Sequence, residues 1–191
     1  MSASQVVFRQ GPRIALRPLE RSDIPQFVQW MNDQEVTRFL MYQLPIMLPM
    51  EEKWFERLCE KPEDNIVLGI TLRGKLIGDV GLHRIDWIGR SAILGIAIGD
   101  KTKWGKGYGR EAMILMLEYA FRCLNFRKIS SMVYAPNIKS IRCHELCGFK
   151  REGLFKEHIF RDGKYSDEVR FGIFERDWLP AWQKFKKTGR I

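Results

Sequence analysis

Residues 92–112 of the chain read AILGIAIGDKTKWGKGYGREA. The segment 92–99 is apolar or glycine throughout, which predicts a buried strand. From residue 106 to residue 125, apolar side chains recur with helical spacing, which predicts an amphipathic helix. Between the strand and the helix lie three glycines at alternate positions, Gly105, Gly107 and Gly109. This stretch therefore predicts a strand, a glycine-rich turn and a helix in direct succession.

The glycine-rich turn is suited to binding a phosphate group. Glycine lets the backbone approach a ligand without a Cβ in the way, and a helix N-terminus offers free N–H groups and the positive end of the helix dipole. Two other phosphate-binding motifs do not fit, because the Walker pattern and the dinucleotide fingerprint need different spacings. Glycine-rich turns also occur for steric reasons alone. The turn by itself predicts an anion site and no particular ligand.

The elements on either side of this unit predict a mixed α/β sheet with helices on its faces. The strands are expected from alternating or continuous apolar runs, and the helices from apolar side chains at helical spacing. The expected strands cover residues 13–17, 65–72, 75–85, 92–99, 128–135, 149–160 and 165–174. The expected helices cover residues 23–31, 50–59, 106–125, 137–147 and about 176–187.

The composition is that of a globular protein. The 191 residues are 45% hydrophobic and 29% charged, enough to bury a full core. Because no repeat or linker divides the chain, we expect one domain over residues 1–191, with its core from about 13 to 175.

The net charge of +9 favours binding of polyanions, such as phosphorylated cofactors, nucleotide sugars or RNA, although no nucleic-acid-binding motif is present. No apolar stretch approaches the roughly 20 residues of a membrane span, and the N-terminus lacks the apolar run of a signal peptide. We therefore expect a cytoplasmic protein without membrane contact.

The cysteines do not indicate a metal site. Cys59, Cys123, Cys143 and Cys147 lie among apolar residues without the paired close spacing of a zinc site. Cys143 and Cys147 would share one helix face, but His144 would point about 100° away from Cys143. We expect reduced, structural thiols and no bound metal.

Several stretches make the chain resemble the GNAT acyltransferases, in particular the branch of Rim-type ribosomal-protein N-terminal acetyltransferases and spermidine acetyltransferases. The stretches are ALRPLERSDI at 15–24, IGDVGLHRIDW at 77–87, WGKGYGREA at 104–112, NIKSIRCHELCGFKREG at 137–153 and FGIFERDW at 171–178. The resemblance implies a seven-stranded mixed sheet that splays open between its fourth and fifth strands, with acetyl-CoA as co-substrate in the opening.

The resemblance also implies which residues contact acetyl-CoA. Strand residues would bond the pantetheine arm through their backbones, N–H groups of the glycine-rich turn would hold the pyrophosphate, and Asn137 would face the pantetheine near the thiol. The implied set is Ile96, Ala97, Ile98, Trp104, Gly105, Lys106, Gly107, Tyr108, Gly109, Arg110 and Asn137.

The chain departs from the family pattern at three positions. Trp104 stands where the family usually has Gln or Arg, so a polar side chain near the phosphates is missing. Ile93 replaces a frequent Glu, which removes one candidate general base. His144 occupies the position where many relatives have the Tyr thought to protonate the CoA thiolate.

Acetyl transfer to an amine needs a base for the ammonium, donors for the tetrahedral oxyanion and an acid for the thiolate. His144 is a candidate acid because an unperturbed His has a pKa of about 6.5. Ser140 is a second candidate, since some Rim-type relatives are thought to use a Ser there. Glu157 is a candidate base. For each of these side chains, a purely structural or solvated position is the alternative.

The acceptor amine stays open at this point. A peptide N-terminal α-amino group, acetylated by direct attack in a ternary complex, is the first expectation, and an amino sugar, a nucleotide-linked amino sugar or a polyamine is the alternative. The positive net charge speaks modestly against a polyamine. A non-catalytic acyl-CoA-binding module is a further alternative.

His83, which has Asp79 and Asp86 close by in the sequence, is a candidate for lining an acceptor pocket. The alternative, and the more common outcome, is a His at a strand end that makes an ordinary hydrogen bond. Trp30 and Trp87 are the tryptophans expected near the acceptor. The aromatic-rich C-terminal helix makes a homodimer a further expectation.

Overall fold

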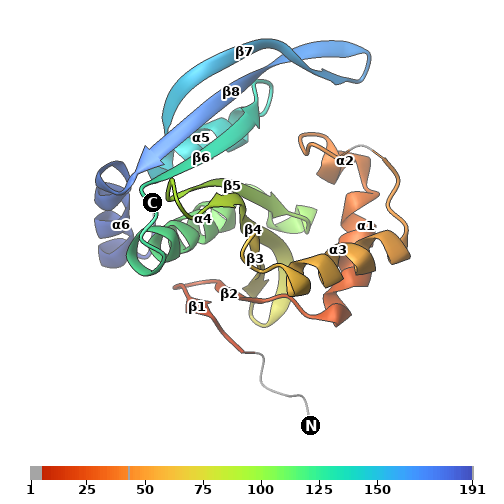
Figure 1. Cartoon of the computed structure of the whole chain (residues 1–191), viewed down its shortest axis with the longest axis horizontal. Helices are drawn as coiled ribbons and strands as arrows, with labels where there is room; N and C mark the ends of the chain where they lie inside the picture. The colour runs from red at the N-terminus through yellow and green to blue at the C-terminus, as the bar shows by residue number, and fades with distance from the viewer. Residues whose placement is uncertain (1–5, 43, 191) are drawn as a thin grey trace.

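The computed structural model describes residues 6–42 and 44–190. One sheet of eight strands, in the order β1-β2-β3-β4-β5-β6-β8-β7, runs through the molecule (Figure 1). The strands are β1 (Arg9–Gln10), β2 (Ala15–Pro18), β3 (Ile66–Leu72), β4 (Lys75–Asp86), β5 (Ser91–Ile98), β6 (Lys128–Tyr134), β7 (Lys150–Arg161) and β8 (Lys164–Phe174). The helices are α1 (Ile24–Met31), α2 (Gln34–Thr37), α3 (Leu48–Glu60), α4 (Tyr108–Glu118), α5 (Ile138–Cys147) and α6 (Glu175–Thr188).

The predicted mixed α/β fold is confirmed, and one short strand and one short α-helix add to the predicted elements. A two-residue strand, β1, pairs with β2 and makes the sheet eight-stranded instead of seven-stranded. The four-residue helix α2 begins where the Asp33 side chain accepts hydrogen bonds from the N–H groups of Glu35 and Val36. Both elements are too short to produce a periodic pattern of apolar residues, which is why the sequence does not indicate them.

The sheet opens between β5 and β6. These two strands pair in parallel only over Ser91–Ile93 and Lys128–Ser130, whereas the other neighbouring strands pair antiparallel. Just beyond the last pair, the Ser131 hydroxyl donates a hydrogen bond to the Leu94 carbonyl at 3.0 Å. We call the opening between residues 94–98 of β5 and 131–134 of β6 the gap. When β1 is discounted, it lies between the fourth and fifth strands, as predicted.

Helices cover both faces of the sheet. Val80 of β4 belongs to the same buried cluster as Met113 of α4. The preceding residue, Asp79, faces the other side of the sheet, where Glu51 of α3 is close enough to raise its pKa. The helices α1, α2 and α3 therefore cover one face, opposite α4 (Figure 1).

The aromatic side chains of α6 mainly complete the core. Trp178 and Phe185 are buried, and Trp182 stacks on Trp178 with ring centroids 5.3 Å apart. These contacts account for the aromatic pattern within one chain, so the homodimer stays a prediction. In the part of the chain that the structure describes, no helix has the length and apolar character needed to cross a bilayer.

Candidate active site

The glycine-rich turn forms an open anion-binding arrangement, and we call residues 104–110 the cradle. Gly105 and Gly107 adopt left-handed backbone conformations, with φ of +71° and +82°. Gly107 is the N-cap of α4 and has no side chain with which to cap it. The first N–H groups of a helix have no partner within the helix. Backbone amides at the start of α4 are therefore suited to an anionic ligand, as predicted from the sequence.

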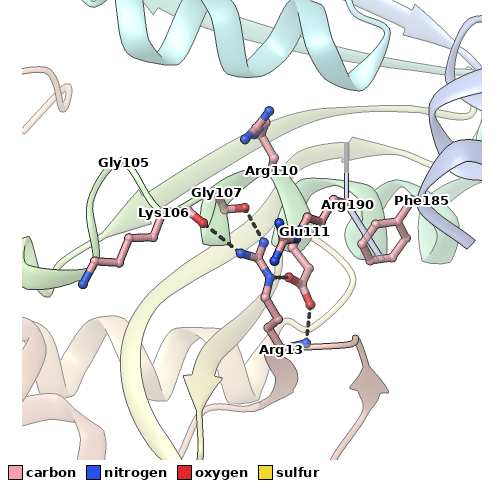
Figure 2. A pocket seen from close by; sticks show the side chains of 8 residues that line it. All are labelled: Arg13, Gly105, Lys106, Gly107, Arg110, Glu111, Phe185 and Arg190. Atoms are coloured by element: carbon pink, nitrogen blue, oxygen red, sulfur yellow. Dashed lines mark hydrogen bonds and ion pairs between the residues drawn. The ribbon is translucent and has the colours of Figure 1, made fainter. Parts of the chain in front are cut away.

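A cavity of about 300 Å³ adjoins the cradle (Figure 2). Four cationic side chains line it: Arg13, Lys106, Arg110 and Arg190. The net positive charge of this lining, which also includes the Glu111 carboxylate, attracts anions toward the cradle. Arg13 and Arg190 come from opposite ends of the chain, and no motif connects them with the turn.

The β5 edge of the gap offers backbone groups at alternate residues, because successive N–H and C=O groups point to opposite sides of a strand. The Leu94 carbonyl faces β6, since it accepts from Ser131. The Ile98 carbonyl, four residues on, has the same orientation and accepts from the Trp104 indole N–H at 2.6 Å. The N–H and C=O of Ile96 therefore open onto the gap, together with the N–H of Ile98.

Ala97 has the opposite orientation, which does not favour the expected backbone bonds between Ala97 and the pantetheine. A Cβ on Gly78 of β4 would collide with the Ala97 carbonyl oxygen, which means that this carbonyl is directed toward β4 and away from the gap. Ala97 is instead the register partner of Asp79. Its small side chain lies on the face of the sheet that carries the Asp79 carboxyl.

The remaining cradle residues have distinct positions. The Trp104 indole N–H, through its hydrogen bond to the Ile98 carbonyl, joins the cradle to the end of β5. The Tyr108 ring lies under the Arg13 guanidinium, 5.0 Å from its centre. Gly109 packs on the side chain of Ile96. A Cβ added to Gly109 would lie 3.7 Å from the end of that side chain.

His144 is buried in the core, with 2% of its surface exposed and its ring stacked on Phe171. Burial lowers the pKa of His144, which favours a neutral ring. Nδ1 lies 2.8 Å from the Ser140 carbonyl oxygen, which can only accept, so Nδ1 carries the proton. Nε2 lies 2.8 Å from Ser131 Oγ and is then an acceptor, so the single hydroxyl proton of Ser131 is shared between Nε2 and the Leu94 carbonyl. In this form His144 has no proton to give toward the gap, which argues against its expected role as acid.

Ser140 is more accessible than His144. It lies in the first turn of α5, is half-buried, and has its hydroxyl 3.4 Å from His144 Nδ1. Asn137 caps this helix, because its side-chain oxygen accepts a hydrogen bond from the Ser140 N–H at 3.1 Å. That bond leaves the Asn137 amide nitrogen as the group with which Asn137 can contact a pantetheine arm.

Glu157, the candidate base, lies on the exposed edge strand β7. It has a left-handed backbone with φ of +48°, within an irregular part of the β7–β8 pairing. Its N–H donates to Asp167 Oδ1, and its side chain is exposed to solvent. This position favours the solvated alternative for Glu157.

Two neighbouring carboxyl groups, Asp79 of β4 and Glu51 of α3, lie beside the gap-lining strand. Glu51 is buried with 7% of its surface exposed, whereas Asp79 keeps part of its side chain accessible. Burial and the nearby charge of Glu51 raise the pKa of Asp79 to about 7. Burial also raises the pKa of Glu51. Since Asp79 is paired with Ala97, the carboxyl group is one strand away from the gap.

The other residues expected at an acceptor pocket are distributed along the sheet. The His83 ring lies over Gly81, on the face that carries Asp79, and burial lowers its pKa. Trp30 packs on Gly99 at the end of β5 that leads to the cradle. Asp86 and Trp87 lie at the opposite end of β5, where Asp86 accepts from the N–H groups of the β4–β5 turn.

Arg161 joins the two halves of the molecule across the open side of the gap. From β7 it donates hydrogen bonds to the carbonyls of Thr37, Leu40 and Tyr42, in and after α2. The Tyr134 hydroxyl of β6 donates to the same Leu40 carbonyl at 3.3 Å. In Figure 1 the β7–β8 hairpin accordingly arches toward α2. Partners more than 90 residues apart leave no local signal in the sequence.

Cys59 and Cys123 are exposed, whereas Cys143 and Cys147 of α5 have ordinary packing contacts. The Cys143 thiol lies 3.5 Å from the Met113 sulfur, and the Cys147 thiol lies 3.8 Å from the Arg110 carbonyl oxygen. Within residues 6–42 and 44–190, no group of three or more His, Cys, Asp or Glu side chains is arranged to hold a metal ion.

Comparison with known proteins gives consistent matches. Residues 13–150 match the family described as the acetyltransferase (GNAT) domain. The spermidine N(1)-acetyltransferase of Vibrio cholerae is 31% identical over 169 residues, which cover 87% of this chain and 96% of that protein. The spermidine N(1)-acetyltransferase of Escherichia coli K12 is 28% identical over 167 residues, which cover 87% of this chain and 88% of that protein.

The fold matches as well. The crystal structure of the Vibrio cholerae spermidine N-acetyltransferase in complex with CoA and spermine superposes with a TM-score of 0.82 at 28% identity, covering 87% of this chain and 98% of the other. Family, relatives and fold agree with the gap and the cradle found here. The chain belongs to the GNAT acetyltransferases and is an N-acetyltransferase that uses acetyl-CoA as its co-substrate.

Proposed function

We propose that this enzyme acetylates a small, positively charged primary amine of the polyamine type. The observation that carries the proposal is the carboxyl pair Asp79 and Glu51 beside the gap, because buried carboxylates attract an ammonium group that the net charge of +9 would repel. The names of the two relatives, both spermidine N(1)-acetyltransferases, support the same acceptor class. A peptide N-terminus, expected first from the sequence, has less support.

We place acetyl-CoA with its diphosphate on the cradle and its pantetheine arm along β5. The Ile96 N–H and C=O and the Ile98 N–H are the backbone groups open to the arm, and the Asn137 amide nitrogen is the side-chain donor near its thiol end. In this position the thioester lies beside Ala97, and therefore close to Asp79.

The reaction uses three groups of the chain in turn. Asp79 takes a proton from the acceptor ammonium, and the neutral amine attacks the thioester carbon. The new C–N bond gives a tetrahedral oxyanion, which a gap-facing N–H of β5 stabilises. The C–S bond then breaks, Ser140 donates its hydroxyl proton to the thiolate, and the amide nitrogen returns a proton to Ser140. The products are the N-acetylated amine, CoA thiol and a protonated Asp79.

An amine panel read by thiol release tests the acceptor class. The panel contains spermidine, spermine, glucosamine and peptides with free N-termini, each with acetyl-CoA. We expect kcat/KM for the polyamines to exceed that for the peptides by about 100-fold or more, since only the polyamines place several ammonium groups near the carboxyl pair. A preference for peptides or for glucosamine would contradict the proposed acceptor. Tight CoA binding without turnover on any amine would favour a non-catalytic module.

The acid is tested by two substitutions on α5. Ser140→Ala is expected to lower kcat by about tenfold, because the thiolate loses its donor. His144→Ala is expected to lower the melting temperature, because it opens a cavity in the core, but to change kcat of the folded protein by less than about threefold. If His144→Ala instead removes activity at an unchanged melting temperature while Ser140→Ala has no effect, His144 is the acid.

A further inference from the structure

Arg13, in the segment before β2, contacts the back of the cradle. Its guanidinium donates a hydrogen bond to the Lys106 carbonyl at 2.8 Å and another to the Gly107 carbonyl at 3.3 Å (Figure 2). Both acceptors are backbone carbonyls of the turn itself. The contact thus joins two parts of the chain that are more than 90 residues apart.

These two bonds help to fix which way the cradle amides face, together with the first helical hydrogen bond of α4, in which the Gly107 carbonyl accepts from the Glu111 N–H at 3.2 Å. In a planar trans peptide the C=O and the N–H point in opposite directions. The Lys106 carbonyl shares its peptide with the Gly107 N–H, and the Gly107 carbonyl shares its peptide with the Tyr108 N–H. Because Arg13 holds both carbonyls, both N–H groups are directed away from Arg13. We infer that Arg13 is a positioning residue that orients the Gly107 and Tyr108 amides toward the CoA diphosphate.

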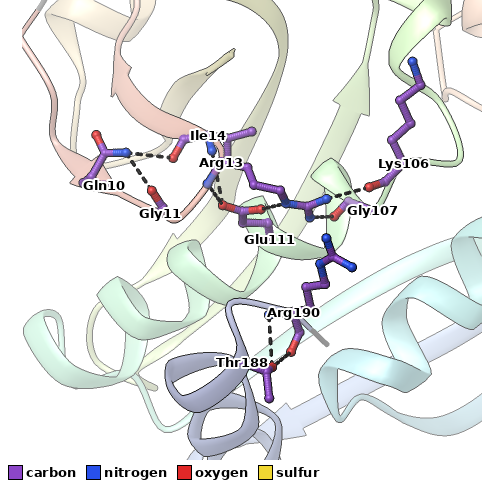
Figure 3. A network of polar contacts seen from close by, with 9 residues as sticks. All are labelled: Gln10, Gly11, Arg13, Ile14, Lys106, Gly107, Glu111, Thr188 and Arg190. Atoms are coloured by element: carbon purple, nitrogen blue, oxygen red, sulfur yellow. Dashed lines mark hydrogen bonds and ion pairs between the residues drawn. The ribbon is translucent and has the colours of Figure 1, made fainter. Parts of the chain in front are cut away.

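Glu111 of α4 holds Arg13 in place (Figure 3). One carboxylate oxygen accepts from the Arg13 Nε at 2.7 Å, and the other accepts from the backbone N–H groups of Arg13 and Ile14 at 2.8 and 3.2 Å. Glu111 is 1% exposed, so its charge depends on these partners. Gly11 allows the approach, because a Cβ there would be 2.6 Å from the Glu111 oxygen.

The turn needs such a clamp because glycine has little conformational preference of its own. Gly105 and Gly107 can populate positive and negative φ about equally well, so their peptides can turn over when nothing holds them. When the amides are fixed before CoA binds, the binding free energy no longer includes the entropy cost of ordering these peptides. The inference rests on the proposed position of the diphosphate on the cradle, and it is independent of the acceptor amine.

Glu111→Gln separates orientation from charge. The substitution removes one negative charge beside the cradle, so Coulomb attraction alone predicts tighter CoA binding. The amide nitrogen of Gln, however, cannot accept from Arg13 Nε, and the clamp loosens. We expect the Kd for CoA, measured by calorimetry, to rise about tenfold. Glu118→Gln is the matched control. Glu118 lies farther along α4, forms an ion pair with Arg9 of β1 at 3.2 Å and does not contact the cradle. Its Kd is expected to stay unchanged.

Arg13→Lys is the second variant, since it keeps the charge and replaces a partly exposed side chain. One ammonium group cannot reproduce the guanidinium fork that reaches both carbonyls and Glu111, so we again expect a Kd about tenfold higher. With S-acetylpantetheine, which has no diphosphate, turnover with spermidine is expected to match the wild-type rate. Unchanged or tighter CoA binding in either variant overturns the inference. An equal loss of turnover with acetyl-CoA and with S-acetylpantetheine also overturns it. Wild-type protein that binds CoA but acetylates no amine would contradict the proposed function and leave the Kd comparison valid.

Discussion

Asp79→Asn is expected to lower kcat/KM for the acceptor amine by about 100-fold, while the Kd for CoA changes by less than about twofold. The amide of Asn cannot take a proton from the ammonium, and it removes one charge of the carboxyl pair with Glu51. Steady-state thiol release and calorimetry with CoA measure the two quantities. Glu157→Gln is the control, because Glu157 is exposed on the edge strand, and its kcat/KM is expected to remain within about twofold of the wild type.

The same assignment predicts the pH dependence. Asp79 acts as a base only when ionised, so activity should rise with pH through the Asp79 pKa of about 7. Burial is the larger cause of this raised pKa and the Glu51 charge the smaller, so Glu51→Gln should move the rising limb to lower pH without restoring the ordinary pKa of an Asp. An unshifted limb in Glu51→Gln, or one that persists in Asp79→Asn, would assign the base to another group.

Asp79 also affects stability, with a sign opposite to that of a salt-bridged carboxylate. Its pKa is raised from 3.8 in the unfolded chain to about 7 in the fold. Between these values the folded state holds a proton that the unfolded state has released, so the free energy of unfolding falls as pH rises. Asp79→Asn should therefore be at least as stable as the wild type at pH 8, in urea unfolding, although it is nearly inactive. A lower stability at that pH would mean that Asp79 has a structural role.

Gly105→Val is expected to raise the Kd for CoA by about 100-fold, because the side chain would occupy the space through which the diphosphate approaches the cradle. Gly163→Val is the control. Gly105 and Gly163 have φ of +71° and +73°, and an added Cβ at either position has no neighbour within 4 Å. Both substitutions should therefore cost a similar 1–2 kcal/mol or so of backbone strain. Equal Kd values for the two variants in calorimetry would show that the cradle does not contact CoA.

The cradle could be predicted from the sequence because its determinants are local. Three glycines at alternate positions and the apolar pattern of α4 lie within one stretch of chain. The splay between β5 and β6 came from the family resemblance, since strand pairing depends on residues far apart. The backbone N–H and C=O groups of successive β5 residues must point to opposite sides of the strand. Which residues direct these groups into the gap depends on the register between β5 and β4. For this reason Ala97 was assigned to the ligand when its backbone faces the neighbouring strand.

The catalytic side chains depend on contacts that have no local pattern. Asp79 and Glu51 come from different elements, and only the fold brings α3 over β4. His144 was expected at the gap, yet α5 turns that side chain into the core against Phe171. Glu157 is a candidate base by residue type alone, and the left-handed backbone in the irregular part of β7 leaves its side chain in solvent, the alternative that the sequence also offers.

A crystal structure with CoA bound tests the central claim most directly. The account predicts diphosphate oxygens about 2.7–3.2 Å from the N–H groups of Gly107, Tyr108 and Gly109, with Arg13 still bonded to the carbonyls behind them. Diphosphate held elsewhere, or cradle amides turned away from it, would contradict the account.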